Sequence, residues 1–343
     1  MKENNNAPRA HNGHAVPEQE PQPLEGSFGL LLPEIQRAVN AEGYVTPTPI
    51  QEQCIPHLLE GRDLLGCAQT GTGKTAAFSL PLLQRVSGRS RKFQKGTPLS
   101  LILAPTRELA AQIGDSIRTY GRFLRVRHTV IFGGVSQFKQ VKALNRGIDI
   151  LVATPGRLLD LIEQGYIHLN QVEVFILDEV DRMLDMGFIP DIERVLTLIP
   201  KERQTLFFSA TMAQKMRYLA NTMVRNPAKV TIAPDKPTLD SIDQKILFVK
   251  KKDKDALLVS LLGDSQINKA LIFTQMKYVA NRVVDKLNDA GIRGIAIHSN
   301  KSQAVRTKAL EGFKRGRFRV MVATDVAARG LDVDDITHVI NYD

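Results

Sequence analysis

A glycine-rich octapeptide, Ala68 to Thr75 with the sequence Ala-Gln-Thr-Gly-Thr-Gly-Lys-Thr, constrains this chain more than any other stretch. Gly71 and Gly73 let the backbone turn tightly, so that successive N–H groups point at one anion. Lys74 adds a positive charge, and Thr75 adds a hydroxyl suited to a phosphate-bound Mg²⁺. An apolar strand precedes the loop and a helix follows it, which favours phosphate at the helix N-terminus. We therefore predict a nucleoside triphosphate site.

The first position of the octapeptide departs from the general P-loop pattern, because Ala68 stands where the first glycine would be. A chance glycine-rich turn before a helix is the alternative, and the motifs further along the chain argue against it. The residues assigned to the phosphate cradle are Ala68, Gln69, Thr70, Gly71, Thr72, Gly73, Lys74 and Thr75.

Length and composition are those of a soluble globular protein. The 343 residues suffice for two domains with separate cores, and 43% of them are hydrophobic and 24% charged. No apolar run approaches the roughly 18 residues that span a bilayer, and the N-terminus lacks the order of a secretory signal. Cys54 and Cys67 have no metal-ligand spacing and suit buried thiols. We therefore expect a cytoplasmic protein, working as a monomer, without membrane association.

The chain is basic, with a formal net charge of +10. Residues 1–26 hold two basic residues against four glutamates, a net of −2, so the remainder carries +12. A basic body fits a polyanionic partner, although a well-solvated surface would look the same.

The N-terminal region precedes the phosphate loop in three parts. Residues 1–26 are rich in Asn, Pro, Glu and Gln, and we expect a disordered tail. A helix is predicted over residues 30–41, and a second helix, through residue 59, follows a proline-stiffened loop at 43–51. Gln51 offers both a donor and an acceptor to a base edge, and a water-facing glutamine is the alternative.

Five apolar segments after the loop each end in a polar motif, and helical patterns separate them. The segments are 99–104, 128–132, 148–153, 172–177 and 205–208. This alternation predicts βαβ units and a parallel sheet. Ligands of such sheets lie beyond the carboxyl ends of the strands, which is where every one of these motifs begins.

The pattern restarts after two prolines near residues 233–237, which read as an interdomain linker. Strands are predicted at 242–249, 269–273, 294–298, 319–324 and 337–341, with helices between them. We expect a second α/β domain of the same style.

Asp178 and Glu179 follow the apolar segment 172–177. Phosphoryl transfer needs a metal to neutralise developing charge and a group that orients the attacking water. A lone Asp-Glu pair is usually a strand-end turn. The preceding phosphate loop and the Ser209-Ala210-Thr211 motif make the catalytic interpretation far more specific.

These ordered motifs resemble those of the DEAD-box family of ATP-dependent RNA helicases, over roughly residues 28 to 343. The resemblance implies two RecA-like parallel-sheet domains of the P-loop NTPase type (helicase superfamily 2), with ATP and Mg²⁺ as cofactors and RNA as partner. It implies an ATP-binding domain at 27–232 with a Q motif at 28–54, a linker at 233–240 and a C-terminal helicase domain at 241–343. The segment 298–314 looks most like the bacterial RhlE-like branch.

The resemblance assigns the nucleotide contacts. Tyr44 and Gln51 would contact the nucleotide, with Gln51 reading adenine, and Phe28 is a weaker candidate for stacking on the base. Residues 68–75 would hold the triphosphate, and Asp332 would meet the ribose.

The resemblance also assigns the chemistry. Thr75 and Asp178 would serve Mg²⁺, and Glu179 would serve the attacking water. The catalytic set is Lys74, Asp178, Glu179, Asp181, Ser209 and Thr211, in which the last three would couple nucleotide state to domain closure. The signature reads Asp-Glu-Val-Asp, so Val180 replaces the family's alanine and changes no chemistry.

RNA contacts are implied in both halves. The matching positions are Thr106, Arg107, Gly134, Thr154, Gly156 and Arg157 in the first, and Thr274, Gln303, Arg306 and Thr324 in the second. Hydroxyls, arginines and backbone N–H groups grip phosphates without reading bases, so we expect binding without sequence specificity and local duplex unwinding.

The family's last motif, His-Arg-x-Gly-Arg-x-x-Arg, does not occur before Asp343. We therefore expect a truncated second domain, and two functions stay open. The first is an RNA-dependent ATPase and helicase. The second is a non-turnover fragment that binds ATP and RNA but lacks the arginine finger. The sequence does not identify the RNA, the pathway or protein partners.

Overall fold

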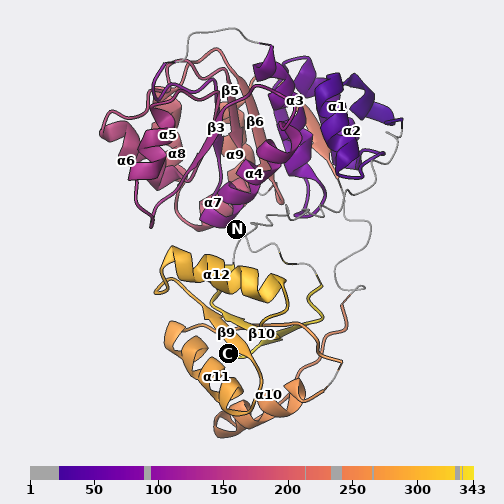
Figure 1. The fold of residues 1–343 in the computed structure, drawn as a ribbon, viewed down its shortest axis with the longest axis vertical. Coiled ribbons are helices and arrows are strands. Elements are labelled where there is room, and N and C mark those ends of the chain that lie inside the picture. The colour runs from indigo at the N-terminus through magenta and orange to yellow at the C-terminus, as the bar shows by residue number, and fades with distance from the viewer. Residues whose placement is uncertain are drawn as a thin grey trace, which may run out of the picture.

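The computed structural model of the chain describes residues 23–88, 94–212, 214–232, 242–264, 266–328, 333 and 335–343. Two parallel β-sheets with helices on their faces form two domains, one from each half of the chain (Figure 1). This is the predicted fold class. None of the described helices is long and apolar enough to cross a membrane.

The first sheet has seven strands in the order β3-β4-β2-β5-β6-β1-β7, and all neighbours are parallel. The strands are β1 (Leu64–Cys67), β2 (Ser100–Leu103), β3 (His128–Ile131), β4 (Ile150–Ala153), β5 (Val174–Leu177), β6 (Gln204–Ser209) and β7 (Ala228–Thr231). The six strands from β1 to β6 were predicted. The edge strand β7 was missed because it has no continuous apolar run: Ala228 and Val230 are buried and alternate with the exposed Lys229 and Thr231.

Helices cover both faces of this sheet. One face carries η1 (Gly26–Leu30), α1 (Pro33–Ala41), α2 (Pro49–Leu59), α3 (Lys74–Ser87) and α4 (Arg107–Tyr120). The other carries α5 (Phe138–Leu144), α6 (Pro155–Glu163), α7 (Val180–Asp185), α8 (Ile189–Leu198) and α9 (Gln214–Met223). Successive strand residues point to opposite faces, so Ile102 joins the first core cluster, and Leu101 and Leu103 join the second. A sheet buried on both faces explains why its strands are continuously apolar.

The second sheet has four described strands in the order β11-β8-β10-β9, again parallel. They are β8 (Ala270–Phe273), β9 (Gly294–Ile297), β10 (Val320–Ala323) and β11 (His338–Asn341). η3 (Lys251–Asp253) precedes α10 (Lys254–Leu262), which packs with α11 (Lys277–Asp289) on one face. α12 (Gln303–Lys314) packs on the other face, and α13 (Asp325–Ala328) follows β10.

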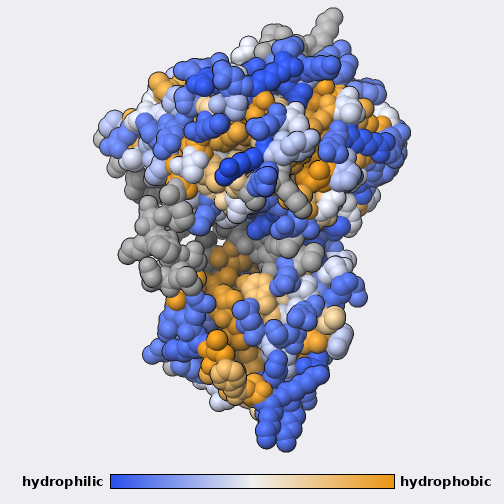
Figure 2. All heavy atoms as spheres, turned by 180° about the vertical axis from the view of Figure 1, so that it is seen from behind, coloured by the Kyte–Doolittle hydropathy of each residue, from blue (hydrophilic) through white to orange (hydrophobic). Residues whose placement is uncertain are grey.

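The second sheet is covered unevenly. α12 buries Phe313 against the cluster that contains Met321 and Leu271. The register places Val339 of the edge strand β11 beside Leu271 on that same face, yet Val339 stays largely exposed. Figure 2, the view from behind, shows apolar surface on this domain.

Three predicted boundaries need comment. The predicted strand at 242–249 is wrong, because this segment pairs with no described strand and Phe248 is 97% exposed. Its apolar residues at 246–249 are consecutive, so they cannot all face one buried side of a sheet. The predicted tail is too long at its end, since the N–H of Glu25 donates to the carbonyl of Val45 (3.1 Å) and a helical turn begins at Gly26. Residues 1–22 and the linker at 233–240 lie outside the described residues.

Candidate nucleotide and RNA-binding site

The phosphate loop follows β1 directly and leads into α3. Gly71 has φ 84° and Gly73 has φ 93°, a left-handed region that other residues rarely adopt. Gly73 also meets the side chains of Thr48 and Gln51 so closely that a Cβ atom would overlap them. The tight turn predicted from the glycines is therefore present, and it lies against the start of α2.

Lys74 is buried at the first position of α3, and its Nζ donates to the carbonyl oxygen of Ala68 at 2.6 Å. The ammonium group thus lies across the loop that it belongs to. An ammonium held by one carbonyl keeps two further N–H donors, which suits the oxygens of a phosphate.

Gln51 connects α2 to the phosphate loop. Its Oε1 accepts from the N–H of Thr48 (2.9 Å) in a capping box, and its Nε2 donates to the carbonyl of Gly73 (3.2 Å). One amide hydrogen and one lone pair remain for a base edge. Capping explains why a glutamine at this helix start is buried, which sequence reasoning did not foresee.

The two aromatic candidates near this site differ in exposure. Tyr44 is half-exposed. Burial, with smaller contributions from Tyr44 and Glu42, raises the pKa of the neighbouring Tyr120 to about 12. Phe28 is 1% exposed and belongs to the first core cluster, so its ring has no free face for stacking on a base. The assignment of Phe28 as an aromatic that stacks on the base is therefore not supported.

The two carboxylates after β5 are both withdrawn from water. Asp178 is 2% exposed and its Oδ1 has no hydrogen-bond partner. Burial raises the pKa of this carboxyl from 3.8 to about 7; the charge of Lys74 opposes the rise and that of Glu179 adds to it. A buried acceptor without a partner costs free energy unless a ligand fills the position.

Glu179 has φ 55°, which is strained for a residue with a side chain and frequent at functional sites. Its Oε2 accepts from Arg182 (2.6 Å), and its Oε1 accepts from the hydroxyl of Thr70 in the phosphate loop (3.5 Å). Burial raises the pKa of Glu179, whereas the charges of Arg182 and Lys74 lower it. The αL conformation therefore turns this carboxylate toward the phosphate loop.

Asp181 and the 209–211 motif form one hydrogen-bonded unit. Asp181 Oδ2 accepts from the N–H of Ala210 (3.1 Å) and from the hydroxyl of Thr211 (3.4 Å). The hydroxyl of Ser209 donates to the carbonyl of Thr211 (2.7 Å). Residues some thirty positions apart are thus joined at the ends of β5 and β6.

The residues present fit a Mg²⁺–nucleotide pair. No group of three His, Cys, Asp or Glu side chains in the described part of the chain could hold a metal ion alone. Mg²⁺ is typically bound by one or two protein oxygens together with phosphates and water. The partnerless Oδ1 of Asp178 and the hydroxyl of Thr75, at the second position of α3, are oxygens of the kind it prefers.

The RNA candidates of the first domain follow the carboxyl ends of β2, β3 and β4. Thr106 caps α4, with its Oγ1 accepting from the N–H of Leu109 (3.2 Å). Gly134 has φ 76°, and the guanidinium of Arg107 lies where its Cβ would be. Glycine is thus needed there both for conformation and for space.

The other candidates of this domain lie at the start of α6. Thr154 occupies its N-cap position, and nothing lies within 4 Å of the position a Cβ of Gly156 would take. Arg157 pairs with Asp160 (3.2 Å) and donates to the carbonyl of Val135 (3.4 Å) beside Gly134. An open glycine at a helix N-terminus lets a phosphate approach the backbone.

The candidates of the second domain lie on the edge that faces the first. Thr274 and Thr324 follow β8 and β10, and both are buried. α12 lies between the second sheet and the first domain (Figure 1), and its Gln303 accepts from Arg107 Nη1 at 3.0 Å. Arg306 lies one turn further along α12. Asp332 lies outside the described residues.

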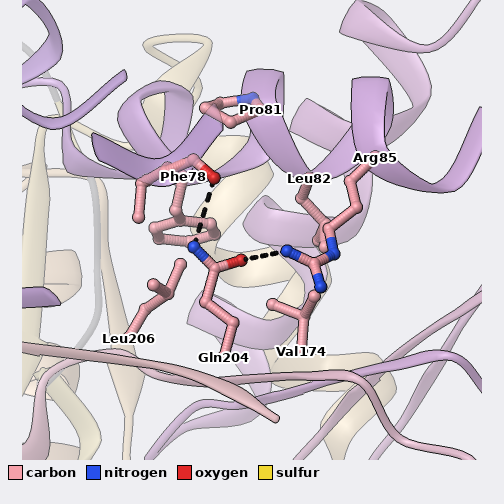
Figure 3. A pocket seen from close by; sticks show the side chains of 8 residues that line it. Phe78, Pro81, Leu82, Arg85, Val174, Gln204 and Leu206 are labelled. Carbon is pink, nitrogen blue, oxygen red and sulfur yellow. Dashed lines mark hydrogen bonds between the residues drawn. The ribbon is translucent and has the colours of Figure 1, made fainter. Parts of the chain in front are cut away.

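A small pocket under α3 is not part of this site. Figure 3 shows Phe78, Pro81 and Leu82 over the first residues of β5 and β6, at the opposite edge of the sheet. Gln204 there accepts from Arg85 (3.0 Å) and donates to the carbonyl of Leu58 (3.2 Å). The bonds tie α2 and α3 to the sheet, so this pocket has a structural role.

Two functional candidates were missed from the sequence. Arg182 neutralises Glu179, and Glu108 contacts the second domain. Helical spacing three residues after Glu179 could have indicated Arg182. Nothing in the sequence places Glu108 beside a helix almost two hundred residues away.

A seven-stranded parallel sheet, with a glycine-rich loop and two carboxylates at its carboxyl edge and a second parallel sheet beside it, defines a P-loop NTPase with two RecA-like domains. Among known families, the DEAD/DEAH box helicases match residues 48–219, and the helicase conserved C-terminal domain matches residues 253–343. The chain belongs to the DEAD-box family of RNA helicases.

Individual relatives agree. DEAD-box ATP-dependent RNA helicase 30 of Oryza sativa subsp. japonica is 44% identical over 96% of this chain and 50% of its own length. DEAD-box ATP-dependent RNA helicase CshA of Streptococcus pneumoniae is 43% identical over 91% of this chain and 58% of its own length. The chain thus spans about half the length of the curated relatives it matches.

Solved structures give the same fold. Dbp5 of Saccharomyces cerevisiae, bound to RNA and ADP BeF3, is 32% identical with a TM-score of 0.77, over 92% of this chain and 79% of that one. A DEAD box protein of Methanococcus jannaschii is 35% identical with a TM-score of 0.55, over 91% of this chain and 83% of that one.

Proposed function

We propose that this chain is an ATP-dependent RNA helicase that grips the RNA backbone without sequence specificity and couples ATP binding and hydrolysis to local duplex unwinding. One observation carries the proposal. The phosphate loop, the carboxylates and the RNA candidates all lie at the carboxyl edges of two sheets that face each other, and Arg107 and Gln303 join these edges. A nucleotide and an RNA bound there would both contact the interface between the domains.

The proposed nucleotide contacts follow from the phosphate loop and the residues next to it. The N–H groups after Gly71 and the ammonium of Lys74 would bind the terminal phosphates, and Gln51 would contact the base. Thr75 and Asp178 would hold Mg²⁺, which supplies charge neutralisation to the phosphates.

Glu179 would orient a water molecule toward the terminal phosphorus. Attack forms a new P–O bond, breaks the bond to the bridging oxygen and releases ADP, inorganic phosphate and a proton. Burial raises the pKa of Glu179, which makes its carboxylate a better proton acceptor than an exposed one. Asp181, hydrogen-bonded to Ala210 and Thr211, would pass changes at the nucleotide to the end of β6.

The proposed RNA contacts are made by groups that bind phosphates. Arg107, Arg157 and Arg306 supply charge, and the N-termini of α4 and α6 supply N–H donors. Closing two domains on one strand would bend it and open a short duplex. We assign Thr274 and Thr324 to the same path because each follows a strand at the facing edge.

Several finer assignments belong to this proposal. We place the chain in the RhlE-like branch, on the resemblance of segment 298–314, with the ATP-binding domain at 27–232 and the helicase C-terminal domain at 241–343. A monomer in the cytoplasm is proposed, and Cys54 and Cys67, both unpaired thiols, suit a reducing compartment.

ATP turnover with and without single-stranded RNA tests the proposal. RNA-stimulated turnover by residues 1–343 would support the helicase, and Lys74→Ala should weaken nucleotide binding because it removes a charge from the triphosphate site. Nucleotide and RNA binding without turnover would instead indicate a non-turnover binding fragment. Absence of RNA binding would reject the function altogether.

Salt titrations distinguish binding to the RNA backbone from recognition of the base sequence. Affinity for unrelated single strands should fall steeply with salt and vary little among sequences, because phosphate neutralisation dominates. A flat salt response or a strong preference for one sequence would contradict this reading.

A further inference from the structure

A buried glutamine connects two turns of the first domain that carry RNA candidates. Gln140 lies in the first turn of α5 and is 8% exposed. Its Nε2 donates to the carbonyl oxygen of Phe132, just after β3 (3.1 Å), and its Oε1 accepts from Arg157 Nη1 at the start of α6 (3.4 Å). The two ends of one amide therefore bind two different turns.

The guanidinium of Arg157 has two further partners. Its Nε pairs with Asp160 (3.2 Å), and its Nη1 and Nη2 both donate to the carbonyl oxygen of Val135 (3.4 Å each). The side chain is 12% exposed, although it is long and charged. Arginine has five N–H donors, and here one on Nη2 has no acceptor among the described residues. Arg157 can thus offer one directed hydrogen bond to a further anion.

The two turns that Gln140 connects are open to solvent. Gly134 and Gly156 are both exposed, and nothing lies within 4 Å of the position that a Cβ of Gly156 would take. The turns follow β3 and β4, which are neighbours in the sheet. Backbone N–H groups of such turns can bind phosphate where no side chain blocks them. The position of one turn relative to the other therefore decides whether neighbouring phosphates of one strand can contact both.

We propose that Gln140 is a positioning residue for RNA binding, which fixes the guanidinium of Arg157 and the turn after β3 relative to each other. The inference rests on the proposed function, because it requires that these turns bind RNA. Gln140 is buried and uncharged, so it does not contact the RNA itself. Its effect is to remove the freedom of a long side chain and of a glycine-containing turn before the RNA binds.

A purely structural role for this amide is the alternative. Buried polar groups are normally hydrogen-bonded, whether or not they serve a ligand. Loss of a structural bond would destabilise the domain and weaken nucleotide and RNA binding alike. Loss of a positioning bond would weaken RNA binding alone, and only while Arg157 is present to be positioned.

Two substitutions and their combination distinguish these roles. Gln140→Met keeps an unbranched side chain of the same length and removes both hydrogen bonds, and RNA affinity should fall about 10-fold. Arg157→Lys keeps the charge but replaces a planar fork by a single ammonium, and a similar loss is expected. The double variant should lose about 10-fold rather than about 100-fold, because both changes remove the same orientation.

The experiment measures binding of a short fluorescent oligouridine to residues 1–343 in the absence of nucleotide. Gln137→Met is the matched control, since this glutamine lies three residues earlier and its amide bonds to Gln164 at the surface (2.8 Å). Binding of Mg²⁺ with a fluorescent ATP analogue, and thermal unfolding, are measured on every variant. Neither should change in Gln140→Met by more than in the control.

Weaker RNA binding in Gln140→Met, not additive with Arg157→Lys and with nucleotide binding intact, supports the positioning role. Unchanged RNA affinity overturns it, and so does an additive loss or a parallel loss of nucleotide binding. If Gln140→Met does not fold, Arg157→Lys decides: weaker RNA binding supports the proposal, and RNA binding as tight as that of the unchanged chain overturns it.

Failure of this inference differs from failure of the proposed function. If the unchanged chain binds the oligouridine and Gln140→Met binds it equally well, only the positioning role is wrong. If the unchanged chain does not bind RNA, the proposed function fails, and the positioning role fails with it.

Discussion

Replacing Asp178 by asparagine should stabilise the nucleotide-free protein while removing its response to Mg²⁺–ATP. Asp178 is buried with one oxygen unpartnered, and its pKa is raised from 3.8 to about 7. A raised carboxyl pKa means that the folded state holds the proton more tightly than the unfolded chain does. Stability is therefore lost as pH rises from about 4 through about 7, and the loss is complete above that range.

The magnitude follows from the size of this pKa rise. About three pH units at 1.36 kcal/mol each give an upper limit on the order of 4 kcal/mol above pH 7, and less than about 1 kcal/mol near pH 4. The Asp178→Asn substitution also removes the negative charge that faces Lys74 and buries an amide. Both effects oppose the gain in stability. We expect a net gain of about 1–2 kcal/mol near pH 8, or about 3–6 °C in the melting temperature of a domain of this size.

Urea and thermal unfolding at about pH 5 and about pH 8, in the absence of nucleotide, measure the effect. Asp115→Asn is the control, since it removes a carboxylate of the same domain that is 66% exposed. Mg²⁺–ATP should stabilise the unchanged protein and have little effect on Asp178→Asn. Equal stability of Asp178→Asn and the unchanged protein near pH 8, or a gain that does not grow with pH, would refute the reasoning.

Two further predictions concern turnover and RNA binding. Glu179→Gln should lower ATP turnover by about 10²–10⁴-fold and leave binding of ATP and RNA intact, which steady-state kinetics and titrations will show; undiminished turnover would remove Glu179 from the mechanism. Gly134→Ala should weaken RNA binding about 10-fold, because the new methyl group displaces the guanidinium of Arg107, and ATP binding should persist. Gly165→Ala, at the same φ of 76° but in open space, is its control, and equal losses in both variants would mean that backbone strain alone is responsible.

Local sequence patterns predicted most strands and the order of the motifs along them. Continuous apolar runs such as 174–177 suffice because a strand buried on both faces leaves no alternation to read. Continuous apolar runs do not identify the strands at the edges of a sheet. β7 alternates and was missed, and residues 242–249 contain the apolar run 246–249 yet form no strand, because strand formation depends on a neighbour that periodicity does not supply.

The candidate site likewise contains features that local sequence patterns predicted and features that only the fold revealed. The glycines at 71 and 73 and the carboxylates at 178 and 179 were identifiable from residue type and spacing, because phosphate and metal chemistry restricts both. The sequence did not reveal that Gln51 caps α2 or that the guanidinium of Arg107 packs against Gly134. Each of these roles depends on a contact that only the folded chain creates.

The sequence by itself determined the two parallel-sheet domains, the phosphate loop and the residues that follow each strand, because hydrophobic periodicity and turn chemistry are local. Only the tertiary structure decided that Asp178 keeps an unpartnered oxygen, that Phe28 is buried, and that Glu108 pairs with Arg306 across the domain interface. Burial and charge balance depend on which distant segments pack together, and no spacing along the chain encodes that.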